Sequence, residues 1–271
     1  MDFNAVIELV HRTADIILDP ERVGHVSEKG RADYVTEADR GVQNFLAREL
    51  ALLTPEAGLY AEEQINEPPD PCRPCWILDP VDGTTNLIHD YQLSAVSLGW
   101  YQNGKITFGV VYNPFTDETY TAEYGRGAFL NGRQLHVSGC DSYRNSLISF
   151  GATPYRKEMA RILFPVYQRI YEQIADFRRG GSAALELCHV AAGRLDAYFE
   201  GDLKPWDYAA GQLIAKEAGA VCTTFSGDPL PVFERADIIA CTPGIFDVLQ
   251  ADLKDLRIAP RMQGAAPFQN L

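Results

Sequence analysis

The chain has 271 residues, of which 46% are hydrophobic and 23% are charged, the ordinary balance of a soluble globular protein. Its 37 Asp and Glu residues outnumber 24 Lys and Arg residues and give a formal net charge of −13. Such a chain repels nucleic-acid backbones and anionic membrane surfaces, so we expect neither as a partner. No apolar stretch approaches membrane-spanning length. Six cysteines favour reduced thiols and a cytoplasmic location.

The N-terminal part of the chain is predicted to be helical. Apolar positions from Phe3 to Leu18 recur at helical spacing, and the proline after Asp19 predicts a helix end there. Residues 21 to 31 are polar and contain glycine, so we expect a mobile loop. Thr36, with Asp39 three residues later, has the pattern of a helix N-cap and its capping box. A second helix is therefore expected to begin at this threonine.

The middle of the chain reads as strands. Two short apolar runs, residues 58–61 and 75–78, suit buried strands, and each is followed by an acid. Residues 93–130 are strand-like with regular turn signals and predict an antiparallel meander.

Beyond about residue 140, strands and helices alternate. The tail from Ala259 is expected to be loosely held. The expected strands lie at 146–150, 195–200 and 237–241, and the expected helices at 157–173, 182–192 and 206–218.

The most informative segment is residues 76–86, WILDPVDGTTN. A buried strand places Asp79 at its carboxyl end, where α/β proteins usually bind ligands. The proline that follows favours a tight turn, which can bring Asp82 to the same side as Asp79. Residues 83–85, Gly-Thr-Thr, offer backbone N–H groups to a phosphate at an expected helix start. Oxygen ligands beside an anion site point to Mg²⁺.

Two other interpretations of this segment fit its residues less well. An isolated D-P-x-D-G can be a plain surface turn, but the apolar strand before it and the threonines after it favour a site. A haloacid-dehalogenase-type phosphatase needs an Asp two residues before Asp82, where Pro80 stands and cannot act as nucleophile. Cys72 and Cys75 form a C-x-x-C pair without a second pair for zinc, and we interpret it as incidental.

Four segments in a fixed order resemble the inositol monophosphatase family, and two more fit the same template. The resemblance spans about residues 28–220. The four are 33–39 (DYVTEAD), 61–63 (AEE), 79–85 (DPVDGTT) and 206–211 (WDYAAG), and the two are 180–183 (GGSA) and 196–200 (DAYFE).

The resemblance implies a layered α-β-α-β-α sandwich, of the α+β or α/β class. Residues 1–140 would form an α+β half with the antiparallel sheet and most metal ligands. Residues 141–271 would form an α/β half that supplies Asp207 and substrate contacts. A homodimer and lithium sensitivity are implied as well.

The same resemblance implies a role for each site residue. Glu62 and Thr84 would orient the attacking water, with Asp39 positioning Thr84. Two or three Mg²⁺ ions would be held by Glu62, Asp79, Asp82, Asp207 and the carbonyl of Val81. The substrate contacts would be Gly83, Thr84, Thr85, Ser182, Ala183, Glu200 and Lys29.

The leading function is Mg²⁺-dependent hydrolysis of a small polyol phosphate, with myo-inositol monophosphate as the first choice. Histidinol phosphate, other sugar phosphates and nucleotide 3′-phosphates remain alternatives. Nucleotide-cleaving relatives resemble one another by a Ser-Ser-Leu-Lys-like segment, and this chain has Ser-Ala-Ala-Leu from Ser182, which favours the inositol branch. A non-catalytic regulatory or binding protein is a further alternative. Ala61 and Leu87 depart from the family pattern, which concerns substrate fit rather than the metal ligands.

Overall fold

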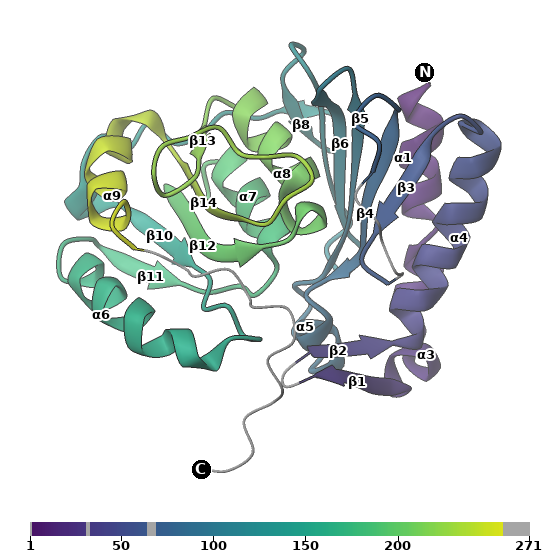
Figure 1. Ribbon diagram of the computed structural model, residues 1–271, viewed down its shortest axis with the longest axis horizontal. Coiled ribbons are helices and arrows are strands. Elements are labelled where there is room, and N and C mark those ends of the chain that lie inside the picture. Colours follow the sequence, from purple (N-terminus) through teal and green to yellow (C-terminus); the bar gives the residue numbers. More distant parts are fainter. Residues whose placement is uncertain (1, 31–32, 64–68, 257–271) are drawn as a thin grey trace.

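Two β-sheets organise the chain, one from each half of the sequence (Figure 1). The computed structural model describes residues 2–30, 33–63 and 69–256. In the seven-stranded sheet the strands lie in chain order, and every pair is antiparallel except the first. The predicted meander is confirmed. The strands are β3 (Gly58–Ala61), β4 (Cys75–Asp82), β5 (Ala95–Gln102), β6 (Lys105–Asn113), β7 (Glu118–Glu123), β8 (Ala128–Leu130) and β9 (Arg133–Gln134).

The second sheet has five strands in the order β11-β10-β12-β14-β13. β10 pairs in parallel with both of its neighbours, whereas β14 is antiparallel to both of its own. The three strands expected in this half are present, while two strands of three residues were not predicted. The bounds are β10 (Leu147–Phe150), β11 (Asp176–Arg178), β12 (Ala197–Leu203), β13 (Val221–Thr223) and β14 (Ala236–Cys241).

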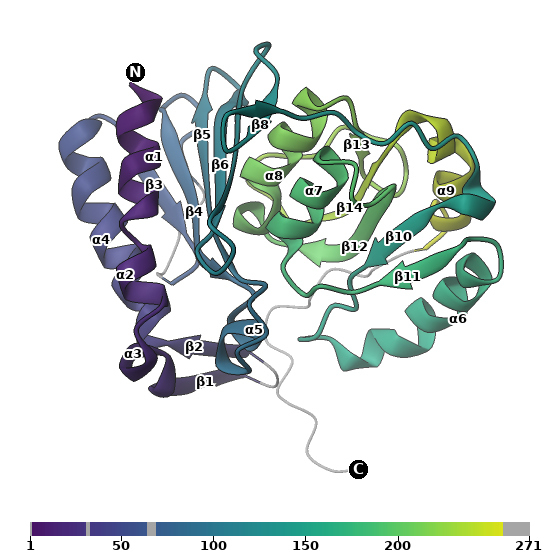
Figure 2. The same cartoon turned by 180° about the vertical axis from the view of Figure 1, so that it is seen from behind.

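Helices cover both sheets and fill the space between them (Figures 1 and 2). The outer face of the larger sheet carries α1 (Phe3–His11), α2 (Ala14–Ile17) and α4 (Glu37–Leu53). Between the sheets lie α7 (Ala183–Ala191) and α8 (Pro205–Glu217), and the outer face of the smaller sheet carries α6 (Ala160–Tyr171) and α9 (Phe246–Leu253). The expected α-β-α-β-α sandwich is confirmed. None of the described helices is long and apolar enough to cross a membrane.

Alternation along β4 shows how one strand serves two layers. Trp76 and Leu78 point to the outer helices, whereas Cys75 and Ile77 point to the helices between the sheets. Because successive side chains of a strand face opposite ways, a run that is apolar throughout is required where both faces are covered. All four side chains are almost fully buried.

The expectation of a loop at residues 21–31 is wrong for residues 21–30, where the structure has a helix and a strand, and residue 31 lies outside the described residues. Pro20 opens a short helix, α3 (Pro20–Gly24), in which Asp19 accepts a hydrogen bond from the N–H of Glu21 at 3.0 Å. After it, β1 (Val26–Gly30) pairs antiparallel with β2 (Asp33–Thr36).

The single N-terminal helix is also wrong, because it is divided between α1 and α2. Thr13 interrupts it, since its hydroxyl donates to the carbonyl of Val10 at 2.6 Å. The expected tail from Ala259 lies outside the described residues.

Candidate active site

The carboxyl ends of β3 and β4 border a cavity of about 360 Å³ between the two halves. Acids from widely separated parts of the chain share its wall, together with the glycine and threonines that follow β4. The lining includes Glu62, Asp79, Val81, Asp82, Gly83, Thr84, Thr85 and Asp207.

Strand register explains why Glu62 and Asp79 come together. β3 and β4 are parallel, and Ala61 pairs with Leu78, so the next residue of each strand is an acid at the same sheet edge. The N–H of Glu62 donates to the carbonyl of Leu78 at 3.2 Å, which continues the pairing. Asp79 is only 1% exposed. The two apolar runs that ended in acid therefore place those acids side by side.

The turn after Asp79 connects the two halves of the molecule. Asp79 accepts a hydrogen bond from the N–H of Val81 at 3.0 Å, which holds the turn. Asp82 accepts from the hydroxyl of Ser182 at 2.7 Å and from the N–H of Ala184 at 2.6 Å. The first turn of α7 is thus bonded to a predicted metal ligand. This contact between the two halves could not be predicted from the sequence.

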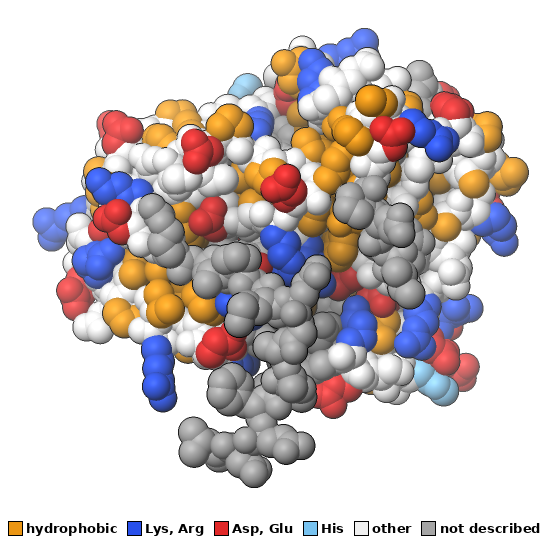
Figure 3. All heavy atoms as spheres, in the orientation of Figure 1, with side chains coloured by type: hydrophobic (Ala, Val, Ile, Leu, Met, Phe, Trp, Pro, Cys, Tyr) orange, Lys and Arg blue, Asp and Glu red, His pale blue; other side chains and the backbone are white. Residues whose placement is uncertain are grey.

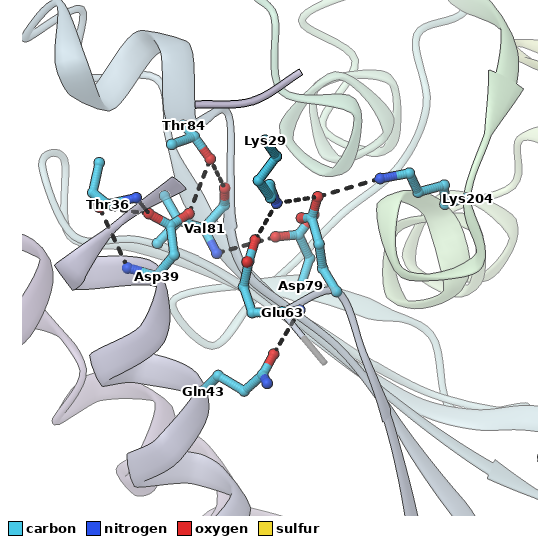
Figure 4. A network of polar contacts seen from close by, with 10 residues as sticks. Lys29, Thr36, Asp39, Gln43, Glu63, Asp79, Val81, Thr84 and Lys204 are labelled. Carbon is cyan, nitrogen blue, oxygen red and sulfur yellow. Dashed lines mark hydrogen bonds and ion pairs between the residues drawn. The ribbon is translucent and has the colours of Figure 1, made fainter. Parts of the chain in front are cut away.

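Behind the turn, Thr84 is held by a small polar network (Figure 4). Thr84 begins α5 (Thr84–Ile88), and its hydroxyl lies 2.9 Å from Asp39 Oδ1 and 3.1 Å from the carbonyl of Val81. Asp39 also accepts from the N–H of Thr36 at 2.8 Å, which completes the predicted capping box of α4. The start of α4 is therefore tied to the turn that carries the acids.

Two lysines approach Glu62 from opposite halves (Figure 4). The ammonium group of Lys29 lies 3.4 Å from Glu62 Oε1 and contacts Glu63 at 2.5 Å. Lys204 lies 3.3 Å from the same Glu62 oxygen. The backbone N–H of Lys204 donates a hydrogen bond to the carboxylate of Asp207 at 2.7 Å, at the start of α8. Glu62 therefore has positive counter-charges from both halves of the chain.

Burial and mutual repulsion disfavour ionisation of the cavity acids. Burial raises the pKa of Asp79 well above its ordinary value, and neighbouring carboxylates, Glu62 foremost, raise it further. Burial also raises the pKa of Asp82 to about 7, against the opposing hydrogen bonds from α7. For Asp207 burial raises the pKa strongly, while the Lys204 ammonium opposes the rise. Clustered carboxylates of this kind are relieved by a bound cation.

The donor set fits Mg²⁺ in its chemistry, since it consists of carboxylates and a backbone carbonyl. Among the described residues, no three His, Cys, Asp or Glu side chains surround a single ion position. Both lysines contact Oε1 of Glu62, so an ion that binds this carboxylate competes with them, and the acids must rearrange around it. The residues present can hold the metal after that rearrangement.

A smaller cavity of about 70 Å³ adjoins the first and shares Asp82 and Asp207 with it. Its lining includes Ser182, Ala183 and Glu200, three of the residues for which the resemblance predicts substrate contacts. One oxygen of Glu200 accepts from the N–H of Thr153 at 3.2 Å, and the other accepts from the hydroxyl of Tyr198 at 2.7 Å.

Sequence reasoning missed several residues that border the two cavities. Lys204 lies three residues before Asp207, and its proximity to that motif was the available signal. Asn86 ends the quoted WILDPVDGTTN segment and lies next to the threonines. Arg179, Tyr155 and Lys157 had no signal, because loops and helix ends carry no periodicity. The predicted contact Lys29 does not line either cavity but reaches Glu62 from β1.

Comparison with known proteins gives a consistent answer. The model of the inositol monophosphatase family matches residues 3–259. The inositol-1-monophosphatase of Rhizobium meliloti is 41% identical over 218 residues, which cover 80% of each chain. The Nus factor SuhB of Vibrio cholerae is 37% identical over 226 residues, which cover 83% of this chain and 84% of the relative.

Solved structures agree with these relatives. The extragenic suppressor protein suhB of Bartonella henselae has a TM-score of 0.84 at 35% identity, covering 93% of this chain and 98% of that chain. An IMPase/NADP phosphatase complexed with Mg²⁺ and phosphate has a TM-score of 0.83 at 25% identity, covering 93% and 94%. Fold and site together define a Mg²⁺-dependent phosphatase, that is, a phosphoric monoester hydrolase. The chain belongs to the inositol monophosphatase family.

Proposed function

We propose that this enzyme hydrolyses a small polyol phosphate, with myo-inositol monophosphate as the first substrate to test. The observation that carries the proposal is the single cavity lined by Glu62, Asp79, Asp82 and Asp207. The relative from Rhizobium meliloti, which is an inositol-1-monophosphatase, supports the choice of substrate. Other sugar phosphates, histidinol phosphate and nucleotide 3′-phosphates are the alternatives.

In this proposal the four acids and the Val81 carbonyl hold two or three Mg²⁺ ions. When bound, the ions supply positive charge that activates water and stabilises the departing oxygen. Residues 83–85 donate hydrogen bonds to the phosphate. Thr84, fixed by Asp39 at 2.9 Å, orients the water together with Glu62.

The alcohol part of the substrate lies in the smaller cavity. There Ser182 and Ala183 line the wall and Glu200 accepts hydrogen bonds from hydroxyl groups, because an ionised carboxylate is acceptor-only. Lys29, which reaches Glu62 at 3.4 Å, attracts the phosphate to the cavity entrance.

The test is a panel of phosphate esters assayed with and without Mg²⁺, repeated with Asp82→Asn. We expect Mg²⁺-dependent release of phosphate and a loss of about 100-fold or more in kcat/KM for the variant, since the neutral amide binds a cation weakly. Asp141→Asn is the matched control, because Asp141 is exposed and lies outside both cavities. Metal-independent activity, or activity unaffected by Asp82→Asn, rejects the mechanism.

A non-catalytic binding role is the second candidate, because the relative from Vibrio cholerae is named a Nus factor. The retained set of acids favours catalysis instead. Folded wild-type protein that hydrolyses no ester in the panel would favour the binding role.

We further propose a cytoplasmic homodimer inhibited by lithium. Support for the location comes from all six cysteines being free thiols. Light scattering coupled to size-exclusion chromatography measures the oligomeric state, and a lithium titration of the Mg²⁺-dependent rate tests the inhibition.

A further inference from the structure

Two basic side chains border the mouth of the acid cavity. Lys157 and Arg179 both line it, and both are exposed to solvent. Within the described part of the chain, neither side chain makes a hydrogen bond or an ion pair. They differ in this from Lys204, which pairs with Glu62 at 3.3 Å. The charges of Lys157 and Arg179 are therefore available to a ligand.

The position of Arg179 links the two cavities. It lines both of them, as do Tyr155 and Gly181. A Cβ atom placed on Gly181 would lie 3.6 Å from Arg179 Nη1, so the guanidinium group lies against the loop that leads to Ser182. A substrate whose alcohol part occupies the smaller cavity passes beside this group.

Lys157 comes from a different element. It begins a one-turn 3-10 helix, η2 (Lys157–Met159), just before α6. Arg156, the residue before it, is buried and forms an ion pair with Asp202 at 3.3 Å, and Asp202 also pairs with Arg235 at 3.2 Å. The backbone that carries Lys157 is thus anchored beside the cavity.

Guanidinium and ammonium groups at a partly enclosed mouth are suited to phosphate, and arginine binds it with two parallel hydrogen bonds. The phosphate that is hydrolysed lies deeper, at the acids and residues 83–85. In the proposed function those groups already bind the hydrolysed phosphate, so the charges of Lys157 and Arg179, at the rim of the cavity, are left for another anion. The rim therefore has the chemistry for a second anionic group of the same substrate.

We propose that Lys157 and Arg179 form a subsite for a second phosphate, so that the preferred substrates are polyol bisphosphates. This inference rests on the proposed phosphatase function and narrows its substrate class. One phosphate reacts: the water oxygen bonds to phosphorus, the ester P–O bond breaks and the departing alkoxide takes a proton. The products are inorganic phosphate and the polyol monophosphate.

A purely structural role for Arg179 gives a different expectation. Its charge opposes the rise in pKa that burial causes at Glu186 and Glu200, so it could act only by balancing these acids. In that case its removal affects monophosphates and bisphosphates alike. The ratio of the two activities separates the alternatives.

The experiment compares mannitol 1-phosphate with mannitol 1,6-bisphosphate, whose flexible chain lets the second phosphate reach the rim. With Mg²⁺ present, we expect kcat/KM to be about tenfold higher for the bisphosphate, as two partly exposed charge contacts allow. This preference should shrink as NaCl is raised, because exposed charges are screened. In Lys157→Met/Arg179→Met the ratio of kcat/KM for the bisphosphate to that for the monophosphate should fall to about 2, the statistical factor for two equivalent phosphates. A change in activity that affects both esters equally does not alter this ratio.

The matched control is Lys105→Met/Arg133→Met, which removes the same number of charges from exposed positions outside both cavities. It should keep the wild-type ratio. Equal kcat/KM values for the two esters in the wild type, or an unchanged ratio in the rim variant, would overturn the inference. If neither mannitol ester is hydrolysed but myo-inositol monophosphate is, the inference is overturned and the proposed function stands. No Mg²⁺-dependent hydrolysis of any ester overturns both.

Discussion

In the wall of the smaller cavity, the Glu200 carboxylate occupies the space that a side chain at Gly151 would need. A Cβ atom on Gly151 would lie 1.7 Å from the Glu200 carboxyl carbon, so any side chain at this position must displace the carboxylate. Gly151 is therefore glycine because the carboxylate of the neighbouring strand needs its volume. The carbonyl of Gly151 also accepts from the hydroxyl of Tyr167 at 2.7 Å, so the backbone has little freedom to move away.

We predict that Gly151→Ala displaces Glu200 and weakens substrate binding. Overpacking of this kind costs about 1–3 kcal/mol of unfolding free energy, and KM for myo-inositol monophosphate should rise more than kcat falls. Steady-state kinetics and urea unfolding measure the two effects. Gly139→Ala is the control, because nothing lies within 4 Å of the added Cβ atom. Equal behaviour of the two variants would contradict the packing argument.

At the scale of elements, one amide connects three backbone segments of the site. Asn86, on α5, donates through Nδ2 to the carbonyl of Leu93 at 2.7 Å and to that of Gly180 at 2.8 Å. From the other side, the N–H of Gly180 bonds to the buried Glu186. The loop that leads to Ser182 is thus held between a residue of the N-terminal half and a residue of α7.

We predict that Asn86→Asp loosens this loop. The substitution replaces the donor by a carboxylate that faces two carbonyl oxygens, and an unsatisfied buried contact costs about 1–3 kcal/mol. The free energy of unfolding should fall by that amount, and KM should rise, because the loop carries the substrate contacts Ser182 and Ala183. Asn103→Asp, in a hairpin turn at φ 55°, is the control and should change neither. A variant that loses stability but keeps KM would show that Asn86 does not position the site.

For the molecule as a whole, the buried acids oppose folding when no metal is bound. The pKa of Asp82 is about 7 in the folded protein, against an ordinary value of 3.8. Between these two pH values the native state therefore binds more protons than the unfolded state. Stability therefore decreases as pH rises from about 4 to about 7. The burial of Asp79 and Asp207 acts in the same direction.

We predict that metal-free protein is less stable at pH 7 than at pH 5, and that Mg²⁺ cancels the difference. At 100 times its Kd, Mg²⁺ should add about 2.7 kcal/mol to the free energy of unfolding. Urea unfolding at both pH values, with EDTA or with Mg²⁺, tests this. Stability in EDTA that rises from pH 5 to pH 7 would have the wrong sign.

Some parts of this site could be predicted from sequence and others could not. The positions of Glu62 and Asp79 could be predicted, because each residue follows a short apolar run and parallel strands bring their ends to one edge. The position of Arg179 could not be predicted, since it depends on how the loop after β11 packs against Gly181. Residues 21–31 have the polar composition of a loop, which hides the strand β1 within them, and β11 and β13 are too short to show a period.

The central claim is that acids from separate segments bind divalent cations in one cavity. Diffraction from crystals soaked in Mn²⁺, which substitutes for Mg²⁺ and scatters anomalously, tests it most directly. The account predicts anomalous peaks bounded by Asp79, Asp82, Asp207 and a Glu62 side chain that has left Lys29 and Lys204. A cavity without a peak, or peaks only at surface carboxylates elsewhere, would contradict it.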